Sequence, residues 1–280
     1  MSPVGNDPPV GLGETPAGFD PPAPSNLGHT LALVALVVGA IAFLMVMFAG
    51  PGYRLGWWDV GTALRTMFKY GAYLGIAAAV LAIVAALMAR RGPGRGALAL
   101  AALALLLGAA AWFFPWSFRR HARAVPPIHD ITTDFVSPPE LTYSRMMRDT
   151  SGGKLNAWQY EGDSIAAQQR KAYPDVQPVM LSMTPDEAYR AVMRVANDMG
   201  WDVVVNDPQG RRLEAVDETK WFGFKDDVSI RVTPASGIAR VDIRSVSRIG
   251  RSDVGKNAER IRAFIARLKQ TYRAQVADTA

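Results

Sequence analysis

The sequence predicts an α+β domain, in which an antiparallel sheet carries two helices on one face, preceded by three transmembrane helices. Three long apolar runs in the first half of the chain predict the membrane spans. Strand-like alternation and two apolar helical stripes beyond residue 180 predict the sheet and its helices. We therefore divide the chain into a disordered tail (residues 1–28), a three-span transmembrane region (residues 29–118) and a soluble domain (residues 119–280).

The composition limits the function before any motif is considered. The chain has 280 residues and a net charge of +6, with no cysteine and three histidines. Nine basic and four acidic residues precede Val125, against 22 basic and 21 acidic residues in the remainder. The positive excess thus flanks the apolar runs, where it orients a membrane protein, and does not mark a nucleic-acid-binding face. We expect no nucleic-acid partner, no disulfide, no metal site and no cofactor.

The first half of the chain reads as a tail followed by membrane spans. Residues 1–26 are rich in proline and glycine and contain no lysine or arginine, which is typical of a disordered tail and not of a signal peptide. Apolar runs follow at residues 31–49, 70–88 and 97–114, each close to the roughly 20 residues that cross a bilayer. None has a polar face, which argues against buried helices of a soluble domain. None contains an ionisable residue, which argues against a transport path.

The segment between the first two runs mixes aromatic and charged residues. Residues 50–69 contain Trp57 and Trp58 beside Arg54 and Asp59. This mixture is typical of a segment that lies in the membrane interface. Anchoring is our interpretation, and a substrate gate is the alternative.

The basic residues give two conflicting indications of orientation. The short loop at residues 89–96 contains Arg90, Arg91 and Arg95, which favours a cytoplasmic loop and an external C-terminal domain. A larger group on the opposite side favours a cytoplasmic domain: Arg54, Arg65, Lys69, Arg119, Arg120 and Arg123.

The second half begins with a proline-punctuated segment, residues 125–179, which we expect to be extended and to wrap the following domain, with one short helix at residues 164–171. A capping box with a proline at the first helical position, Thr184 to Glu187, then starts a helix that Gly200 ends. The expected strands pair residues 201–206 with 211–216 and residues 227–233 with 238–249, and an extra strand is expected at residues 179–183. A final amphipathic helix contains Ile261, Phe264, Ile265, Leu268 and Tyr272.

Two of these strands should present charged residues on one face of the sheet. Val228 and Ile230 alternate with Asp227 and Arg231, and the partner strand follows the same pattern. The period of two sends the apolar residues toward the helices and the charged residues to the other face. That face is interpreted either as solvated and self-neutralised, or as an arginine-lined groove for a carboxylate or phosphate.

The loop before the last helix carries the densest polar chemistry. Residues 250–257 read GRSDVGKN, which matches a phosphate-binding loop except at its last position. Asn257 replaces the hydroxyl that binds Mg²⁺, Asp253 brings a negative charge, and the preceding strand belongs to an antiparallel hairpin. We therefore interpret the match as false, while backbone N–H groups and Lys256 at a helix N-terminus remain able to hold an anion.

Two further motifs have open interpretations. Residues 221–224, WFGF, form an aromatic loop that fills a core, contacts the membrane or covers a ligand. His129 and Asp130 in PPIHDITTD are interpreted as a base and its orienting group, although no nucleophile is assignable nearby.

Four segments in order resemble domain-of-unknown-function family 1499 (DUF1499): PPIHDITTD, AYPDVQPV, FGFKDDVSIRV and ARVDIRSVSRIGRSDVGKNAERIRAF. The resemblance covers residues 125–268, and the membrane-spanning part looks like a variable attachment. The family implies no catalytic residue. Relatives that look like lipoproteins or thylakoid-lumen proteins imply a domain outside the cytoplasm, so the resemblance favours a bacterial inner-membrane protein with a periplasmic domain.

Two functional hypotheses follow. The main one is a membrane-anchored envelope protein that is not an enzyme and binds an anionic ligand or partner, such as an anionic lipid or an envelope protein. Its candidate anion-binding residues are Arg231, Arg244, Arg248, Arg251, Ser252 and Lys256. The alternative is an envelope hydrolase that uses residues around His129, Asp130 and Asp227. Titratable groups in a cleft with shifted pKa values would favour the hydrolase.

Overall fold

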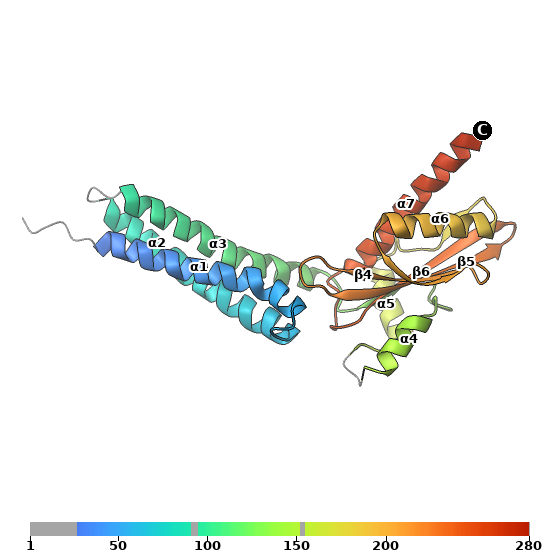
Figure 1. The fold of residues 1–280 in the computed structure, drawn as a ribbon, viewed down its shortest axis with the longest axis horizontal. Coiled ribbons are helices and arrows are strands. Elements are labelled where there is room, and N and C mark those ends of the chain that lie inside the picture. The colour runs from blue at the N-terminus through green and yellow to red at the C-terminus, as the bar shows by residue number, and fades with distance from the viewer. Residues whose placement is uncertain (1–26, 91–94, 152–154, 280) are drawn as a thin grey trace, which may run out of the picture.

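The computed structural model describes residues 27–90, 95–151 and 155–279. A bundle of three long helices lies at one end of the molecule and a folded domain built on a β-sheet lies at the other (Figure 1). This arrangement confirms the predicted fold class. Residues 1–26 of the predicted disordered tail lie outside the described residues, and its last two residues, Leu27 and Gly28, are helical.

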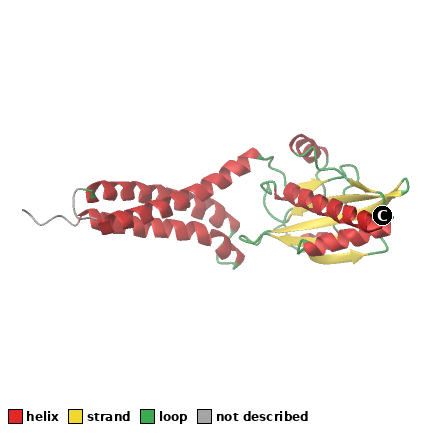
Figure 2. Cartoon of the chain, turned by 90° about the horizontal axis from the view of Figure 1, so that it is seen from above, coloured by secondary structure: helices red, strands yellow, loops and turns green. Residues whose placement is uncertain are grey.

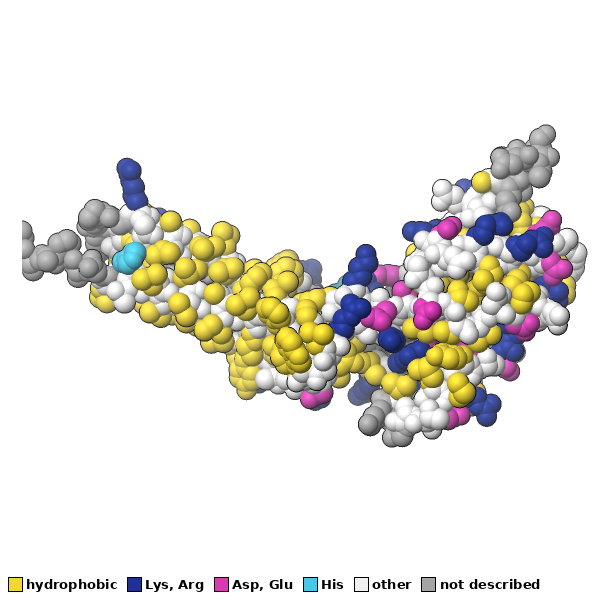
Figure 3. Space-filling view, viewed as in Figure 1, with side chains coloured by type: hydrophobic (Ala, Val, Ile, Leu, Met, Phe, Trp, Pro, Cys, Tyr) yellow, Lys and Arg dark blue, Asp and Glu magenta, His cyan; other side chains and the backbone are white. Residues whose placement is uncertain are grey.

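The bundle consists of α1 (Leu27–Arg54), α2 (Phe68–Ala89) and α3 (Arg95–Ala124), and a π-helical turn, η1 (Thr62–Met67), leads directly into α2. By length and composition, all three helices are able to cross a membrane. A helix of 28 residues is about 42 Å long, against a hydrocarbon core of about 30 Å. Large apolar side chains cover the outside of the bundle, as expected for lipid-facing helices (Figure 3).

Small residues line the inside of the bundle. The buried positions of the three helices are mostly alanine and glycine, which lets the backbones approach closely. A Cβ added to Gly75 would lie 2.5 Å from the carbonyl oxygen of Gly108, and a Cβ on Gly108 would lie 2.5 Å from that of Gly75. The crossing of α2 and α3 therefore has no room for a larger side chain.

The end of α1 and the end of α3 both lie next to the folded domain (Figure 2). The segment between α1 and α2 lies at this end as well, with Arg54 beside the domain. Arg90 and Arg95 lie at the opposite end of the bundle, where α2 finishes and α3 starts. If the helices cross a membrane, these two groups of basic residues are on opposite sides of it.

The sheet has six antiparallel strands. They are β1 (Asp130–Thr132), β2 (Val179–Leu181), β3 (Asp202–Asp207), β4 (Arg212–Glu218), β5 (Lys225–Ala235) and β6 (Ile238–Ser247). The order is β1-β6-β5-β4-β3, and β2 also pairs with β6. β1 lies against the end of β6 and β2 against its beginning, so the two short strands share one edge. The extra strand expected at residues 179–183 is β2, whereas β1 was not predicted.

Two helices, α6 (Pro185–Asp198) and α7 (Lys256–Thr279), cover one face of the sheet (Figure 1). The predicted capping box starts α6: the Thr184 hydroxyl accepts a hydrogen bond from the Glu187 backbone, and the Glu187 carboxylate accepts one from the Thr184 backbone. Apolar residues of the central strands pack against the two helices, with Ile230 and Ile243 fully buried opposite Phe264. Each such side chain contributes roughly 1.5–3 kcal/mol when buried.

The segment at residues 125–179 wraps the domain, but it is less extended than predicted. It contains β1, α4 (Thr142–Asp149), α5 (Asp163–Ala172) and the start of β2. α5 corresponds to the short helix expected at residues 164–171. α4 was expected to be extended chain and is instead a helix on the face of the sheet opposite α6 and α7 (Figure 1).

Candidate functional site

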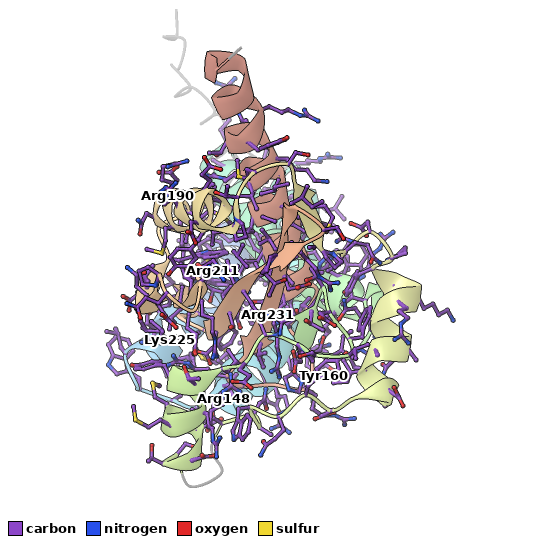
Figure 4. The ribbon with its side chains drawn as sticks, turned by 90° about the vertical axis from the view of Figure 1, so that its right-hand side faces the viewer. Arg148, Tyr160, Arg190, Arg211, Lys225 and Arg231 are labelled. Atoms are coloured by element: carbon purple, nitrogen blue, oxygen red, sulfur yellow. The ribbon has the colours of Figure 1, made fainter. Side chains whose placement is uncertain are left out.

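The charged face of the sheet is covered by α4, which a carboxylate holds at each end. At its first turn, the Glu214 carboxylate of β4 accepts a hydrogen bond from the Thr142 backbone N–H, 2.5 Å away. A negative charge is favourable there because the N-terminal end of a helix carries a partial positive charge. Further along α4, the Asp227 carboxylate of β5 accepts hydrogen bonds from Ser144 and Arg148, both at 2.6 Å. Figure 4 shows Arg148 on the α4 side of the sheet.

Asp227 is the centre of this buried network. Besides Ser144 and Arg148, it accepts a hydrogen bond from Arg248 at 2.8 Å, so two guanidinium groups share one carboxylate. Burial by itself would raise the pKa of Asp227, but hydrogen bonds from Arg248 and Ser144 and the two positive charges outweigh it and lower the pKa. The carboxylate therefore stays ionised and fixed by its partners.

Two more arginines on this face are bound in the same way. Arg244 makes a bidentate contact with Asp130, at 3.0 and 2.7 Å. Arg231 lies 3.0 Å from Asp134 and 3.4 Å from Asp242. The face is thus neither solvated nor an open groove, because α4 and the chain around it cover these pairs.

The six candidate anion-binding residues therefore do not form one site. Arg231, Arg244 and Arg248 are engaged by carboxylates of the chain itself. Arg251 and Ser252 lie on the loop before α7, and Lys256 is the first residue of α7. Arg251 and Lys256 are exposed, and Lys256 forms a surface ion pair with Glu259 at 2.6 Å. The anion-binding hypothesis narrows to these last three residues.

Asp253 fills the position at the start of α7 where a phosphate would bind. It is buried, and it accepts hydrogen bonds from the backbone N–H groups of Gly255 and Asn257, at 2.8 and 2.7 Å. Asn257 is also buried and donates to the His129 carbonyl and the Ser247 hydroxyl, at 2.9 and 3.0 Å. Burial raises the pKa of the Asp253 carboxyl. The loop that matches the phosphate-loop pattern is therefore structural, because the Asp253 carboxylate is bonded to backbone N–H groups that a phosphate would need.

The loop at residues 250–256 faces the helical bundle. A ring nitrogen of His121, near the end of α3, is 3.2 Å from the Val254 carbonyl oxygen. The Ser252 hydroxyl accepts a hydrogen bond from the Val254 backbone and keeps its own proton to donate. The remaining anion candidates consequently lie at the end of the domain that is next to the membrane-spanning helices.

The aromatic loop between β4 and β5 docks on the same end of the bundle. The Trp221 indole donates a hydrogen bond to the Met47 carbonyl of α1, at 3.2 Å. Arg54 of α1 pairs with Glu218 at 2.7 Å and donates to the Lys220 carbonyl at 3.0 Å. Of the interpretations left open for this loop, core filling fits the structure, and the core is one that the domain shares with the bundle.

A cavity of about 430 Å³ lies between the aromatic loop, the loop at residues 249–256 and the bundle. Its apolar wall includes Val60, Leu64, Phe118, Phe222 and Phe224. Its polar wall includes His121, Lys225, Ser252 and Lys256, together with Asp226, Asp253 and Glu259. The volume falls in the range of roughly 300–1,000 Å³ that small-molecule sites occupy.

The residues of the hydrolase hypothesis do not converge. Asp130 and Asp227 both pair with Val246 of the intervening strand, so their backbones are two strands, or about 10 Å, apart. Each carboxylate is bound by arginine, and His129 is only partly buried. In the described ranges, no group of three or more histidine or acidic side chains is placed to hold a metal ion.

The folded domain matches the model of a family described as protein of unknown function (DUF1499), over residues 130–268. The folded domain of this chain belongs to that family. The match confirms the resemblance drawn from the four sequence segments. It begins at β1 and ends within α7, so the three helices of the bundle lie outside it. A comparison with curated proteins gives no match.

Sequence reasoning missed the cavity beside the DUF1499 domain. Its walls come from the interface segment, the end of α3 and two loops of the domain. Residues such as Leu64 and Phe118 look like ordinary membrane-anchoring residues in the sequence. The available signal was the aromatic loop, because three aromatic residues on one exposed turn need a surface to pack against.

Proposed function

We propose that this DUF1499 protein is a non-enzymatic binding protein of the bacterial cell envelope. Its three helices anchor it in the inner membrane, its folded domain lies on the periplasmic side, and its ligand is an anionic group that contacts Arg251, Ser252 and Lys256. The observation that carries the proposal is that Ser252 and Lys256 line a cavity beside the bundle, next to a contact between Val254 and His121 of α3.

The charges at this end of the molecule support an anionic ligand at the membrane surface. Basic side chains gather where the bundle meets the domain (Figure 3). By the order of the elements, the basic residues at this end of the helices are Arg54, Arg65, Lys69, Arg119, Arg120 and Arg123. Arg251 and Lys256 add two exposed cations from the domain. Each basic residue near an anionic membrane surface contributes about 1 kcal/mol to its attraction. A lipid phosphate in the adjacent leaflet would meet cations from both parts of the chain.

Two observations support the periplasmic side. Arg90 and Arg95 lie at the end of the bundle away from the domain. The sequence has a third arginine between these two positions, and a compact arginine cluster favours the cytoplasm. The resemblance to extracytoplasmic family members points the same way. The larger number of basic residues at the domain end opposes this orientation, and we interpret them as headgroup contacts.

The hydrolase alternative has less support. A general base needs a pKa near the working pH and access to a substrate. The pKa of Asp227 is lowered, and its oxygens are occupied by Arg148, Arg248 and Ser144. The arrangement is that of a structural network.

Retention of anionic lipid by the full chain tests the proposal. The chain is purified in micelles that contain equal amounts of phosphatidylglycerol and phosphatidylcholine, and bound lipids are counted by native mass spectrometry. We expect the wild type to retain more phosphatidylglycerol than phosphatidylcholine. In the double variant Arg251→Glu/Lys256→Glu, the ratio of bound phosphatidylglycerol to bound phosphatidylcholine should fall roughly tenfold.

Arg190→Glu is the matched control, because Arg190 is exposed on α6, on the other side of the sheet from α4 (Figure 4). It should retain the wild-type preference. Equal retention of both lipids by the wild type, or an unchanged preference in the double variant, would overturn the proposal.

A further inference from the structure

We infer that the cavity between the aromatic loop and the bundle holds an acyl chain of a membrane lipid. The inference deepens the proposed function, on which it rests for the presence of lipid at this surface, and it names a site for the hydrocarbon part of the ligand. Four features of the cavity support it: its lining, its depth relative to the membrane, a neighbouring hollow on the lipid side and its charge balance.

The lining is apolar on the side of the bundle. Leu64 of η1 and Phe118 of α3 form one wall, and Phe222 and Phe224 of the aromatic loop form another. The Phe222 and Phe224 rings are stacked, with centroids 4.7 Å apart, which gives a flat apolar surface. A flexible hydrocarbon chain fits such walls because it needs no hydrogen-bonding partner.

The cavity lies at the level where the hydrocarbon core of a bilayer ends. Tryptophans mark that level in membrane proteins because their rings are apolar and their N–H groups are polar. Trp57 and Trp58 follow α1, Trp116 is near the end of α3, and Trp221 lies at the tip of the aromatic loop beside them. A lipid chain therefore reaches the cavity without leaving the membrane.

A second hollow, of about 650 Å³, adjoins the cavity on the lipid side. It runs along α3 past Phe114 and Trp116, both of which are exposed on the outside of the bundle. It shares Phe118, His121 and Trp221 with the first cavity. These three side chains thus line both hollows, of which one faces the outside of the bundle and the other faces the domain.

The acidic residues at the polar end already have partners. Asp226 accepts a hydrogen bond from Arg260 at 2.6 Å, and Glu259 pairs with Lys256 at 2.6 Å. Asp253 is bonded to backbone N–H groups of its own loop.

Donors at this end include the Ser252 hydroxyl and the half-exposed Lys225 ammonium group, which is 3.7 Å from Glu218. They suit the ester and phosphate oxygens of a lipid whose chain lies among the aromatic rings.

Photo-crosslinking with a phosphatidylcholine that carries a diazirine near the end of one acyl chain tests the inference. The full chain is reconstituted in nanodiscs, irradiated and digested, and labelled peptides are identified by mass spectrometry. We expect label on residues 219–225 and 249–254 of the folded domain, in addition to the outer faces of the helices. Label confined to the helices would overturn the inference, and this outcome needs no variant.

Leu64→Trp provides a second readout, because a larger side chain at Leu64 fills the cavity. Labelling of the two domain loops should fall roughly tenfold, whereas Leu55→Trp, at an exposed position, should leave it unchanged. Undiminished labelling in a folded Leu64→Trp protein would count against the site.

The two proposals fail separately in these experiments. The phosphatidylcholine probe is zwitterionic, so Arg251→Glu should not change its labelling of the domain. If the phosphatidylglycerol preference is absent but the domain loops are labelled, the anionic-ligand proposal fails and the acyl-chain site stands. If the preference is present but the loops are not labelled, the acyl-chain site fails and the anionic-ligand proposal stands.

Discussion

The indole N–H of Trp221 donates a hydrogen bond to the backbone carbonyl of Met47 in α1, at 3.2 Å. This carbonyl is four residues before Pro51, which lies inside the helix and has no N–H to donate. The proline therefore leaves a carbonyl of α1 without its helical partner, and the folded domain supplies the missing donor. A local interruption in a membrane helix becomes the point where the domain is attached.

Replacing Trp221 with phenylalanine should weaken this attachment. The ring remains but the donor is lost, and the unsatisfied carbonyl should lower the free energy of unfolding by about 1–3 kcal/mol. Thermal unfolding of the full chain in micelles measures the loss, and Trp57→Phe, at an exposed position, is the control. Pro51→Ala restores a backbone donor, so it should recover part of the loss in the Trp221→Phe background. No recovery in the double variant would contradict the explanation.

The crossing of α2 and α3 gives a second prediction. Gly108→Ala adds a Cβ that lies 2.5 Å from the Gly75 carbonyl oxygen. Overpacking of this kind costs about 1–3 kcal/mol, which should exceed the gain of roughly 1 kcal/mol in helix propensity. Gly96→Ala, where no atom of the described residues lies within 4 Å, should be neutral or stabilising. The melting temperatures of the two variants in micelles check the prediction, and equal values would contradict it.

The sequence predicted most of the elements whose apolar residues face the core, but it did not predict β1 or α4. The buried residues of α4 are Ser144 and Arg148, one turn apart, whereas Met146 is 60% exposed. An ordinary amphipathic helix buries its apolar side chains and exposes its polar ones. α4 does the opposite, because it packs on the charged face of the sheet and buries ion pairs. A search for apolar periodicity cannot recognise such a helix without knowledge of the face that it covers.

The candidate site was predictable only in part. The loop at residues 250–257 was recognised as polar and its phosphate-loop pattern was interpreted as false, and the bonds of Asp253 to Gly255 and Asn257 give the physical reason. The nearest carboxylate partners of Arg231 and Arg244 are Asp134 and Asp130, more than 90 residues earlier in the chain. Which arginines are free therefore depends on tertiary contacts that no local pattern contains.

Asp227 should make stability depend on pH. The pKa of Asp227 is lower in the folded protein than its unfolded value of about 3.9. Its contribution to the free energy of unfolding is therefore fully present above about pH 3.9 and is lost as the pH falls through the pKa of the folded state. Asp227→Asn leaves Arg148 and Arg248 without their carboxylate and should cost about 3–5 kcal/mol at pH 6. Denaturant unfolding at pH 6 and pH 3 should show a smaller pH effect in the variant than in the wild type. Asp202→Asn, at an exposed position, is the control, and an equally large pH effect in Asp227→Asn would show that another group is responsible.

A reporter fusion tests the proposed orientation. An enzyme that is active only outside the cytoplasm, fused after residue 280, should be active, because we place the folded domain on the periplasmic side. The same enzyme inserted between α2 and α3 should be inactive, since an odd number of spans separates that loop from the domain. Activity at the loop and none at the C-terminus would reverse the orientation, and the basic residues at the domain end would then follow the usual charge rule.

Asn257→Thr completes the phosphate-loop pattern and tests whether the pattern has functional meaning. Threonine lacks the amide that bonds to the His129 carbonyl and the Ser247 hydroxyl, so buried polar groups lose their partners. We expect a loss of about 2–3 kcal/mol in the free energy of unfolding and no binding of ATP or GTP by equilibrium dialysis, because Asp253 still occupies the helix N-terminus. Lys256→Ala, an exposed position in the same turn, should cost less than about 0.5 kcal/mol. Nucleotide binding by the threonine variant would show that the loop lacks only the hydroxyl, and the structural interpretation of Asp253 would have to be abandoned.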